Sequence, residues 1–262
     1  MPELPEVETY RRILERHATG KTIAAVSVRD AGVLAGVTSR ALSGALRGRT
    51  VMGARRHGKI VFADLGPGPW LVLRFGMTGD LVPLGAGEEP RFARVVLRFL
   101  EGGGLAYTDA RKFGSLALAV SPEAYLASGR IGPDVLAVAP AAFAREAARR
   151  RAPIKAVLLD QALLAGVGNL YADEALFQAG IHPATPASRI DAAGLSSLHA
   201  VVRRVIARAV AIEADWSRLP RRWLLPWRDA GGPCPHCGSP LRRLRIGGRT
   251  SVFCPSKQRR RR

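Results

Sequence analysis

The sequence predicts an α+β multidomain protein: an N-terminal helix with an antiparallel β-sandwich, then a helical region, then a small C-terminal β-hairpin. Three observations predict this class. Apolar residues near the start recur at helical spacing, short strand-like segments fill the region from about residue 21 to 120, and all three cysteines lie near the C-terminus. The 262 residues, of which 47% are hydrophobic, are enough to bury a core in the larger regions.

Residues 5–17 are expected to form the first helix. Val7, Tyr10 and Leu14 recur at helical spacing, and Pro5 suits a first turn. Short apolar segments separated by Gly- and Pro-rich turns then favour a sandwich of strands. The expected strands are Thr22–Val28, Lys59–Leu65, Trp70–Phe75, Arg94–Leu100 and Leu105–Thr108.

A linker near Ser121–Pro140 separates the strands from a helical region, in which Asp191 is expected to cap a long helix. The apolar stripe of that helix consists of Leu195, Leu198, Val202, Val205, Ala209 and Ile212. The domains are expected to span residues 1–125, 126–228 and 229–262. The last domain ends in four arginines, Arg259–Arg262, which are expected to be disordered and to attract phosphates.

The charge balance indicates a polyanionic partner. The net charge is +19, and Arg outnumbers Lys by 35 to 5. Arg makes forked contacts to phosphate, so nucleic acid is the favoured partner. A coding bias toward Arg is the alternative explanation. Arg203, Arg204 and Arg208 lie off the apolar stripe and are expected to face solvent or DNA.

The sequence predicts a cytoplasmic protein with no membrane partner. No segment is long and apolar enough to cross a bilayer, and the acidic N-terminus lacks the apolar region of a signal peptide. Three cysteines cannot all pair as disulfides, and a reducing compartment is therefore expected.

The chain start, Met-Pro-Glu, suggests a catalytic amine. A small second residue permits removal of the initiator Met, which would give Pro2 a free secondary amine. An α-amino group has a pKa of about 7.7–8.0 against about 10.4 for Lys, so more of it is unprotonated at neutral pH. It can attack a sugar carbon and form an iminium ion, with Glu3 as general acid and base and Glu6 as a second carboxylate. The alternative is that Pro2 and Glu3 merely begin a helix.

Several motifs occur in order along nearly the whole chain. They are MPELPEVETYRR at the start, RRHGKI around Lys59, FGMTG around Met77, DARKFG at 109–114 and DQALLAGVGNLYADEALFQAGIHP at 160–183. With the cysteine-containing hairpin that follows, they resemble the formamidopyrimidine-DNA glycosylase (Fpg/Nei) family. The resemblance implies an N-terminal helix and β-sandwich, a helix–two-turn–helix domain and a zinc-finger-like hairpin.

The resemblance also implies a function. It predicts a bacterial, nucleoid-associated and monomeric enzyme of base excision repair, a DNA glycosylase that is also an abasic-site lyase and acts on damaged double-stranded DNA. No redox or nucleotide cofactor is implied. Pro2 would be the Schiff-base nucleophile, with Glu3 and Glu6 as catalytic carboxylates, and the strand would be cut by β,δ-elimination. Lys59 would hold the damaged nucleotide and its phosphate, although on its own it fits an ordinary strand-end lysine.

Six residues match DNA-binding positions of the family. Met77, Arg111 and Phe113 match the residues that fill the gap left by a flipped base, although singly Met77 and Phe113 would more often be core residues. Ala110 replaces the Pro that is usual in this motif. Asn169 follows two glycines that would let backbone amides approach a phosphate, and it can cap the next helix or donate to the phosphate; a plain turn is the alternative. Lys155 and Arg249 match basic residues near the DNA.

The metal site is incomplete. Cys234, Cys237 and Cys254 match three of the four expected zinc ligands, and Lys257 replaces the fourth. A protonated Lys cannot bind zinc, His236 would be a strained substitute, and water could fill a weak fourth position. The sequence leaves a weak Zn²⁺ site and a zinc-free hairpin as alternatives.

The preferred lesion stays open between two classes. Leu219–Gly232 is shorter than the loop that closes over 8-oxoguanine in Fpg members, which favours the oxidised pyrimidines of Nei members, whereas the N-terminus is Fpg-like. A noncatalytic binder of damaged DNA and a general basic nucleoid protein are rival functions. The intact Pro2, Glu3 and Lys59 disfavour the first, and the motif order disfavours the second.

Overall fold

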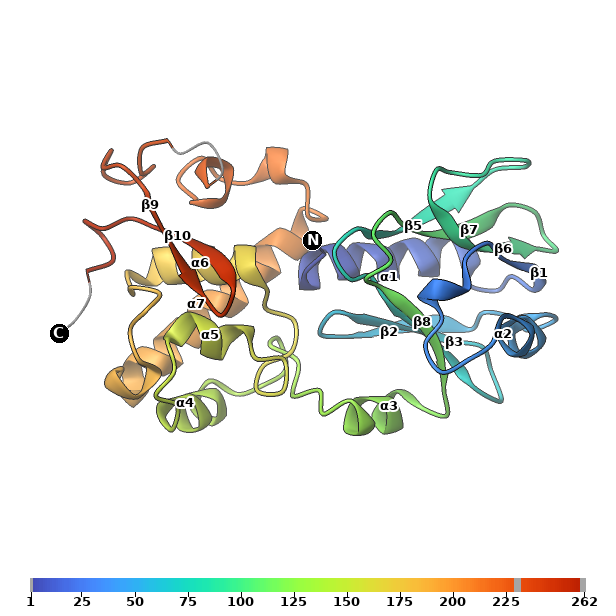
Figure 1. Ribbon diagram of the computed structural model, residues 1–262, viewed down its shortest axis with the longest axis horizontal. Helices are drawn as coiled ribbons and strands as arrows, with labels where there is room; N and C mark the ends of the chain where they lie inside the picture. The colour runs from blue at the N-terminus through green and yellow to red at the C-terminus, as the bar shows by residue number, and fades with distance from the viewer. Residues whose placement is uncertain (1, 229–231, 260–262) are drawn as a thin grey trace. The chain divides into compact units, whose positions relative to one another are not determined.

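The computed structural model describes residues 2–228 and 232–259. The chain divides into two compact units (Figure 1): the first holds Pro2 and Glu6–Arg130, and the second holds Glu3–Pro5 and Ile131–Arg262. Three stretches lie outside the described residues: Met1, residues 229–231 and Arg260–Arg262. They include the initiator Met, the start of the third expected domain and most of the arginine tail. Within the described part, no helix is long and apolar enough to cross a membrane.

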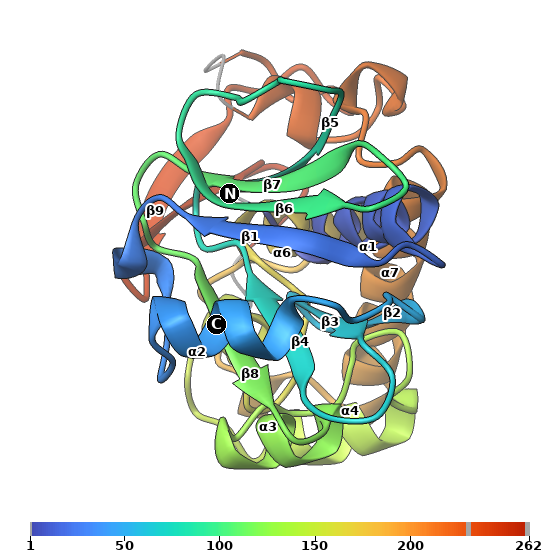
Figure 2. The same ribbon diagram turned by 90° about the vertical axis from the view of Figure 1, so that its right-hand side faces the viewer.

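The first unit is the expected helix and β-sandwich. Helix α1 spans Leu4–Ala18, one residue longer at each end than the expected helix 5–17. One antiparallel sheet has the order β1–β6–β7–β5, with bounds Ile23–Val28, Ala93–Phe99, Gly104–Asp109 and Gly79–Leu84. The other has the order β2–β3–β4–β8 (Figure 2), with bounds Gly53–His57, Ile60–Asp64, Trp70–Arg74 and Ser115–Ala119. Apolar side chains of both sheets share one core with Val7 and Leu14 of α1.

The structure contains elements that the sequence pattern did not predict. Strands β2, β5 and β8 were missed: β2 is GARRH, with almost no apolar alternation, and β5 contains a Pro. Helix α2, Ser39–Leu46, is capped by Thr38, whose side chain accepts a hydrogen bond from the Ala41 amide. Helix α3, Pro122–Ser128, occupies the start of the expected linker.

The helical part of the second unit is formed by α4, α5, α6 and α7, with bounds Pro140–Ala148, Ile154–Leu159, Asn169–Ala179 and Ala192–Ala211. The predicted apolar stripe of α7 is buried along its whole length. The predicted cap of α7 is confirmed, because the Asp191 carboxylate accepts a hydrogen bond from the Gly194 amide at 2.7 Å. Burial of the stripe leaves the opposite face of α7 exposed, as expected for its arginines.

A two-stranded hairpin, β9 (Arg242–Ile246) and β10 (Arg249–Phe253), completes the second unit. Its turn is Gly247–Gly248, and both glycines have positive φ, as a tight hairpin turn requires. The hairpin packs against α6 through a small apolar cluster that includes Phe177, Val252 and Cys254.

A buried charge network ties the hairpin to the helices. The Asp173 carboxylate of α6 lies 2.6 Å from Lys155 Nζ and 3.0 Å from Arg228 Nε. It also accepts hydrogen bonds from the Ser251 hydroxyl at 2.7 Å and from the Val252 amide at 3.0 Å, both on β10. The side chains of Lys155 and Asp173 have no exposed surface. One carboxylate therefore pairs with two cations and positions a strand.

We expect Asp173→Asn to lower the free energy of unfolding by about 3–5 kcal/mol, because it leaves two buried cations without their anion. The measurement is urea-induced unfolding. The matched control is Asp160→Asn, whose carboxylate pairs with Arg150 at 3.3 Å and is 34% exposed. The control should change stability by less than about 1 kcal/mol, and equal effects of the two substitutions would contradict the role given to Asp173.

Candidate functional site

Glu3 is fixed at the N-terminus of α6. Its carboxylate is fully buried and accepts hydrogen bonds from the backbone amides of Leu170 at 2.7 Å and Tyr171 at 3.3 Å. The first amides of a helix have no partner within the helix, and the helix dipole favours negative charge at this end. The fold therefore holds a carboxylate in one defined place, directly after Pro2 in the chain.

Two glycines before α6 make room for the chain start. A Cβ on Gly168 would lie 2.2 Å from Glu3 Cδ, and a Cβ on Gly166 would lie 2.6 Å from Leu4 Cδ1. Gly166 also has a φ of +112°, and its carbonyl accepts a hydrogen bond from the Leu4 amide at 3.2 Å. In this structure the two glycines admit Glu3 and Leu4, and the approach of a phosphate to their backbone stays a prediction.

Asn169 is the first residue of α6 rather than its cap. Gly168 occupies the cap position, and no side chain there accepts a capping hydrogen bond. The Asn169 Oδ1 atom is buried without a partner among the described residues. Capping by Asn169 is therefore not observed, and its contact with DNA stays a prediction.

Lys59 lies in the two-residue turn between β2 and β3 of the first unit, where His57 pairs with Ile60. Gly58 supplies a φ of +55° at the first turn position. Arg56 braces this turn, donating one hydrogen bond to the Gly58 carbonyl at 3.1 Å and another to Glu8 of α1 at 3.0 Å. The turn thus carries Lys59 on a short, anchored hairpin.

The residues expected to fill a gap in DNA lie on two adjacent loops of the first unit. Met77 and Phe113 are exposed, by 39% and 59%, although residues of these types usually belong to the core. The Arg111 guanidinium lies 4.6 Å from the centre of the Phe113 ring, so the two side chains form one exposed group. This exposure supports the expected role, which stays a prediction.

Asp109, which the sequence reading did not single out, holds these loops together. Its carboxylate accepts hydrogen bonds from the Thr78 hydroxyl at 2.5 Å, the Arg111 amide at 3.1 Å and the Gly114 amide at 2.8 Å. Burial opposes its ionisation, but these hydrogen bonds outweigh burial and hold the pKa of Asp109 below its usual value. A Cβ on Gly76 would lie 2.4 Å from the Gly114 amide nitrogen, so the two loops touch through their backbones.

Lys155 and Arg249 have opposite environments. Arg249 is exposed at the first position of β10, next to the hairpin turn, as a phosphate-binding residue would be. Lys155 has no exposed surface, and its ammonium group contacts Asp173 and the Thr250 carbonyl. Burial is the main cause that lowers the pKa of Lys155, and the Asp173 carboxylate opposes it. In this structure Lys155 therefore supports the strand that carries Arg249, and its contact with DNA stays a prediction.

Glu174 is a further buried acid that the sequence reading missed. Its carboxyl oxygens accept hydrogen bonds from the Gln178 side chain at 2.7 Å and from the Leu225 amide at 2.9 Å. Burial raises the pKa of Glu174 to about 7. The signal in the sequence is the pair Asp173-Glu174 in the middle of a mostly apolar helix, since buried acids need specific partners.

The three cysteines form a compact group of thiols. Their Sγ atoms all lie within 4.8 Å of one another, and those of Cys237 and Cys254 are 3.5 Å apart. Thiolates on a tetrahedral zinc ion would be about 3.8 Å apart, so three ligand positions fit. Lys257 Nζ instead lies 5.4 Å from the centre of the Phe177 ring. These cysteines would hold a structural Zn²⁺, which would stabilise the base of the hairpin, with its fourth position left to water.

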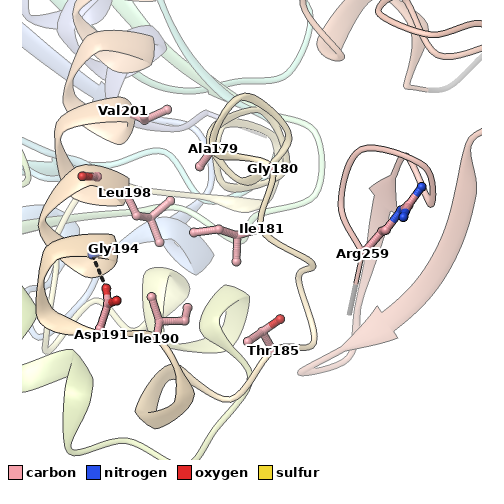
Figure 3. A pocket seen from close by; sticks show the side chains of 11 residues that line it. Ala179, Gly180, Ile181, Thr185, Ile190, Asp191, Gly194, Leu198, Val201 and Arg259 are labelled. Carbon is pink, nitrogen blue, oxygen red and sulfur yellow. Dashed lines mark hydrogen bonds between the residues drawn. The ribbon is translucent and has the colours of Figure 1, made fainter. Parts of the chain in front are cut away.

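A pocket of about 270 Å³ lies between the end of α6 and the start of α7 (Figure 3). It is lined mainly by apolar side chains, including those of Ile181, Ile190 and Leu198. Its carboxylate, Asp191, is already used to cap α7. None of the expected catalytic residues lines this pocket, so it is not the candidate site.

Comparisons with known proteins identify the family to which the chain belongs. Family models match residues 1–116 as the formamidopyrimidine-DNA glycosylase N-terminal domain, residues 131–220 as the H2TH domain, and residues 231–256 as a zinc finger found in FPG and IleRS. The chain belongs to the formamidopyrimidine-DNA glycosylase family. It is 36% identical to the formamidopyrimidine-DNA glycosylase of Desulfitobacterium hafniense, over 98% of this chain and 100% of that protein. It is 38% identical to that of Halorhodospira halophila, over 99% and 100%.

Solved structures of the family have the same fold. The Lactococcus lactis enzyme non-covalently bound to DNA with an abasic site matches with a TM-score of 0.90 at 27% identity, covering 99% of this chain and 100% of that one. MutM in complex with DNA containing carbocyclic 8-oxo-G matches with a TM-score of 0.89 at 28% identity, with the same coverage. The N-terminal domain, H2TH domain and C-terminal finger predicted from the sequence are thereby confirmed.

We expect Gly168→Ala to displace the Glu3 carboxylate from α6, because the added Cβ would occupy its place. Overpacking of this kind lowers stability by about 1–3 kcal/mol. Amide NMR shifts of Leu170 and Tyr171 report the loss of the two hydrogen bonds. The matched control is Gly44→Ala on α2, where an added Cβ meets nothing within 4 Å. Unchanged Leu170 and Tyr171 signals in Gly168→Ala would refute the steric argument.

We expect Lys257→Cys to complete the metal site and to raise zinc affinity by at least about tenfold, since a structural zinc prefers four protein ligands. Competition with a chromogenic chelator measures the affinity. Lys257→Ser is the control, because it removes the same cation without adding a thiolate. Equal zinc affinity of the Cys and Ser variants would show that the fourth position is not where the sequence pattern places it.

Proposed function

We propose that this protein is a DNA glycosylase and abasic-site lyase of base excision repair that uses the amine of Pro2 as its nucleophile. The observation that carries the proposal is the buried Glu3 carboxylate, held by the amides of α6 directly after Pro2. Family membership supports the glycosylase activity and damaged double-stranded DNA as the substrate, because the matched structures include family members bound to abasic-site and 8-oxo-G DNA.

In the proposed reaction, the Pro2 nitrogen attacks C1′ of the damaged nucleotide, and the base leaves with the electron pair of the glycosidic bond. Glu3 takes up the proton that the attacking nitrogen loses and delivers it to the sugar ring oxygen, and the freed nitrogen lone pair opens the ring to form an iminium ion. The iminium ion acidifies C2′, so loss of its proton expels the 3′ phosphate. Loss of a second proton, from C4′, expels the 5′ phosphate. Glu6 is the second carboxylate available to move protons.

The remaining residues are proposed to hold the DNA. Lys59, on its anchored hairpin turn, binds the phosphate of the damaged nucleotide. Met77, Arg111 and Phe113 fill the gap that the flipped base leaves, since an enzyme that acts on a base in a duplex must first rotate it out. Arg249 binds a backbone phosphate from the hairpin tip. Their support in the structure is the exposure of Met77, Arg111, Phe113 and Arg249. The partly exposed Lys59 is supported by its position in the anchored turn between β2 and β3.

Borohydride reduction should trap a covalent complex between the mature chain and DNA that contains an abasic site, with the crosslink on Pro2. A variant that retains the initiator Met should lose trapping and strand cleavage, because its Pro2 nitrogen lies in a peptide bond. Pro2→Gly is the matched variant and should keep weak activity, since a free α-amine remains. Mass spectrometry locates the crosslink, and full activity of the blocked chain would overturn the proposal.

The lesion class is tested with duplexes that carry 8-oxoguanine, a formamidopyrimidine, thymine glycol or 5-hydroxycytosine. The Fpg-like N-terminus favours the first two, and the short segment Leu219–Gly232 favours the last two. In the described part of this segment, Trp223, Leu224 and Leu225 are buried in the helical unit rather than extended as a loop. Excision rates on the four duplexes decide between these expectations.

A further inference from the structure

A basic groove of about 460 Å³ lies in the second unit, and none of the residues proposed for catalysis is among its lining residues. It is bordered by the C-terminal half of α6, the exposed face of α7, the segment after Leu219 and the cysteine loops of the hairpin. We define the basic groove by five of its lining residues: Arg204, Arg208, Arg222, His236 and Lys257.

The described lining of the basic groove is positively charged. Arg204, Arg208 and Arg222 are exposed, and Lys257 adds a fourth cation, whereas no Asp or Glu is among the described residues that line the groove. The Arg204 guanidinium contacts the Gln178 side chain at 3.4 Å, a neutral group that leaves its charge uncompensated. Like charges this close repel, and an anion in the groove would relieve that repulsion.

Lys257 links the basic groove to the altered zinc motif. It stands where the family pattern has its fourth cysteine, and its ammonium group lies over the Phe177 ring at 5.4 Å. A cation held over an aromatic face is partly ordered before any ligand arrives. The substitution therefore removes a metal ligand and adds an ordered positive charge to the groove.

The basic groove lies at the opposite end of the hairpin from Arg249. Arg249 pairs with Ile246 beside the turn, whereas His236 and Lys257 belong to the cysteine loops at the open end, beyond the pair Phe253–Arg242. Strands rise about 3.3 Å per residue, so five-residue strands separate the two ends by about 13 Å. One phosphate cannot contact both places.

We propose that the basic groove binds the phosphodiester backbone of duplex DNA at a second place, distinct from the hairpin tip. Arg side chains match phosphate with forked hydrogen bonds, and a row of them along α7 suits a charged backbone better than a single small anion. This contact requires no lesion, so it goes beyond the proposed excision reaction. It would hold the protein on undamaged DNA.

The test compares Arg204→Ala/Arg208→Ala with a matched double variant on α4, Arg145→Ala/Arg149→Ala, whose side chains are 66% and 71% exposed and border Glu146. Fluorescence anisotropy measures binding to an undamaged duplex between about 50 and 200 mM salt. Each lost phosphate contact reduces the slope of log K against log salt by about 0.9, so the groove variant should lose about 1.8. The α4 variant should keep the wild-type slope.

Lys257→Gln provides a second variant that removes one groove charge and should lower the slope by about 0.9, with Lys257→Arg restoring it. Equal slopes for the groove and α4 variants would overturn the proposal. Polyglutamate serves as a model of an acidic protein. If the groove variant bound polyglutamate more weakly than the wild type but kept the DNA slope, the partner would be an acidic protein and the proposal would also be overturned. Borohydride trapping on saturating abasic DNA should be the same in all variants. If the proposed reaction of Pro2 were wrong, trapping would therefore fail in the wild type and in every variant, and the salt dependence of DNA binding would be unaffected.

Discussion

The Glu3 carboxylate has one place in this fold, and the segment that begins α6 is arranged around it. The amides that begin α6 hold it, and the missing side chain of Gly168 provides its space. Leu4 follows into the apolar core of the helices, where its amide bonds to Gly166. Folding therefore immobilises the residue after the proposed nucleophile before any DNA is bound. Such preorganisation removes an ordering step from the reaction itself.

Two neighbouring acids of α6, Asp173 and Glu174, are both buried, and different partners compensate the cost of burying each carboxyl group. Asp173 contacts two cations and the donors of β10, and these contacts fix the hairpin that carries Arg249. Glu174 bonds to the Leu225 amide, and burial raises its pKa to about 7. Between pH 4.5 and 7 the folded protein keeps a proton on Glu174 that the unfolded chain releases. The contribution of Glu174 to stability is therefore largest below this range and declines as the pH rises through it.

Local patterns in the sequence predicted the features that depend on residues near one another in the chain, such as helical periodicity and helix caps. The stripe of α7 and its Asp191 cap follow from helical periodicity and a short side chain at a helix start. Strand β2 could not be predicted in this way, because GARRH is positioned by pairing with β3 rather than by its own apolar residues. Lys155 was interpreted from its match to a family position, and Gly168 from the small size of glycine. Their roles depend on Asp173 and Glu3, which only the tertiary fold brings to them.

The hairpin can stay folded without a cysteine at position 257, because hydrogen bonds outside the cysteine group also attach it to the helices. A structural zinc normally supplies much of the folding free energy of a small finger. Here Gln258 bonds to the Cys254 amide and to the Ile181 carbonyl, each at 2.9 Å, and so ties the last cysteine to the end of α6. Asp173 holds β10 independently of the thiols. With both anchors in place, Lys257 can replace a metal ligand without releasing the hairpin, and its charge then faces the basic groove.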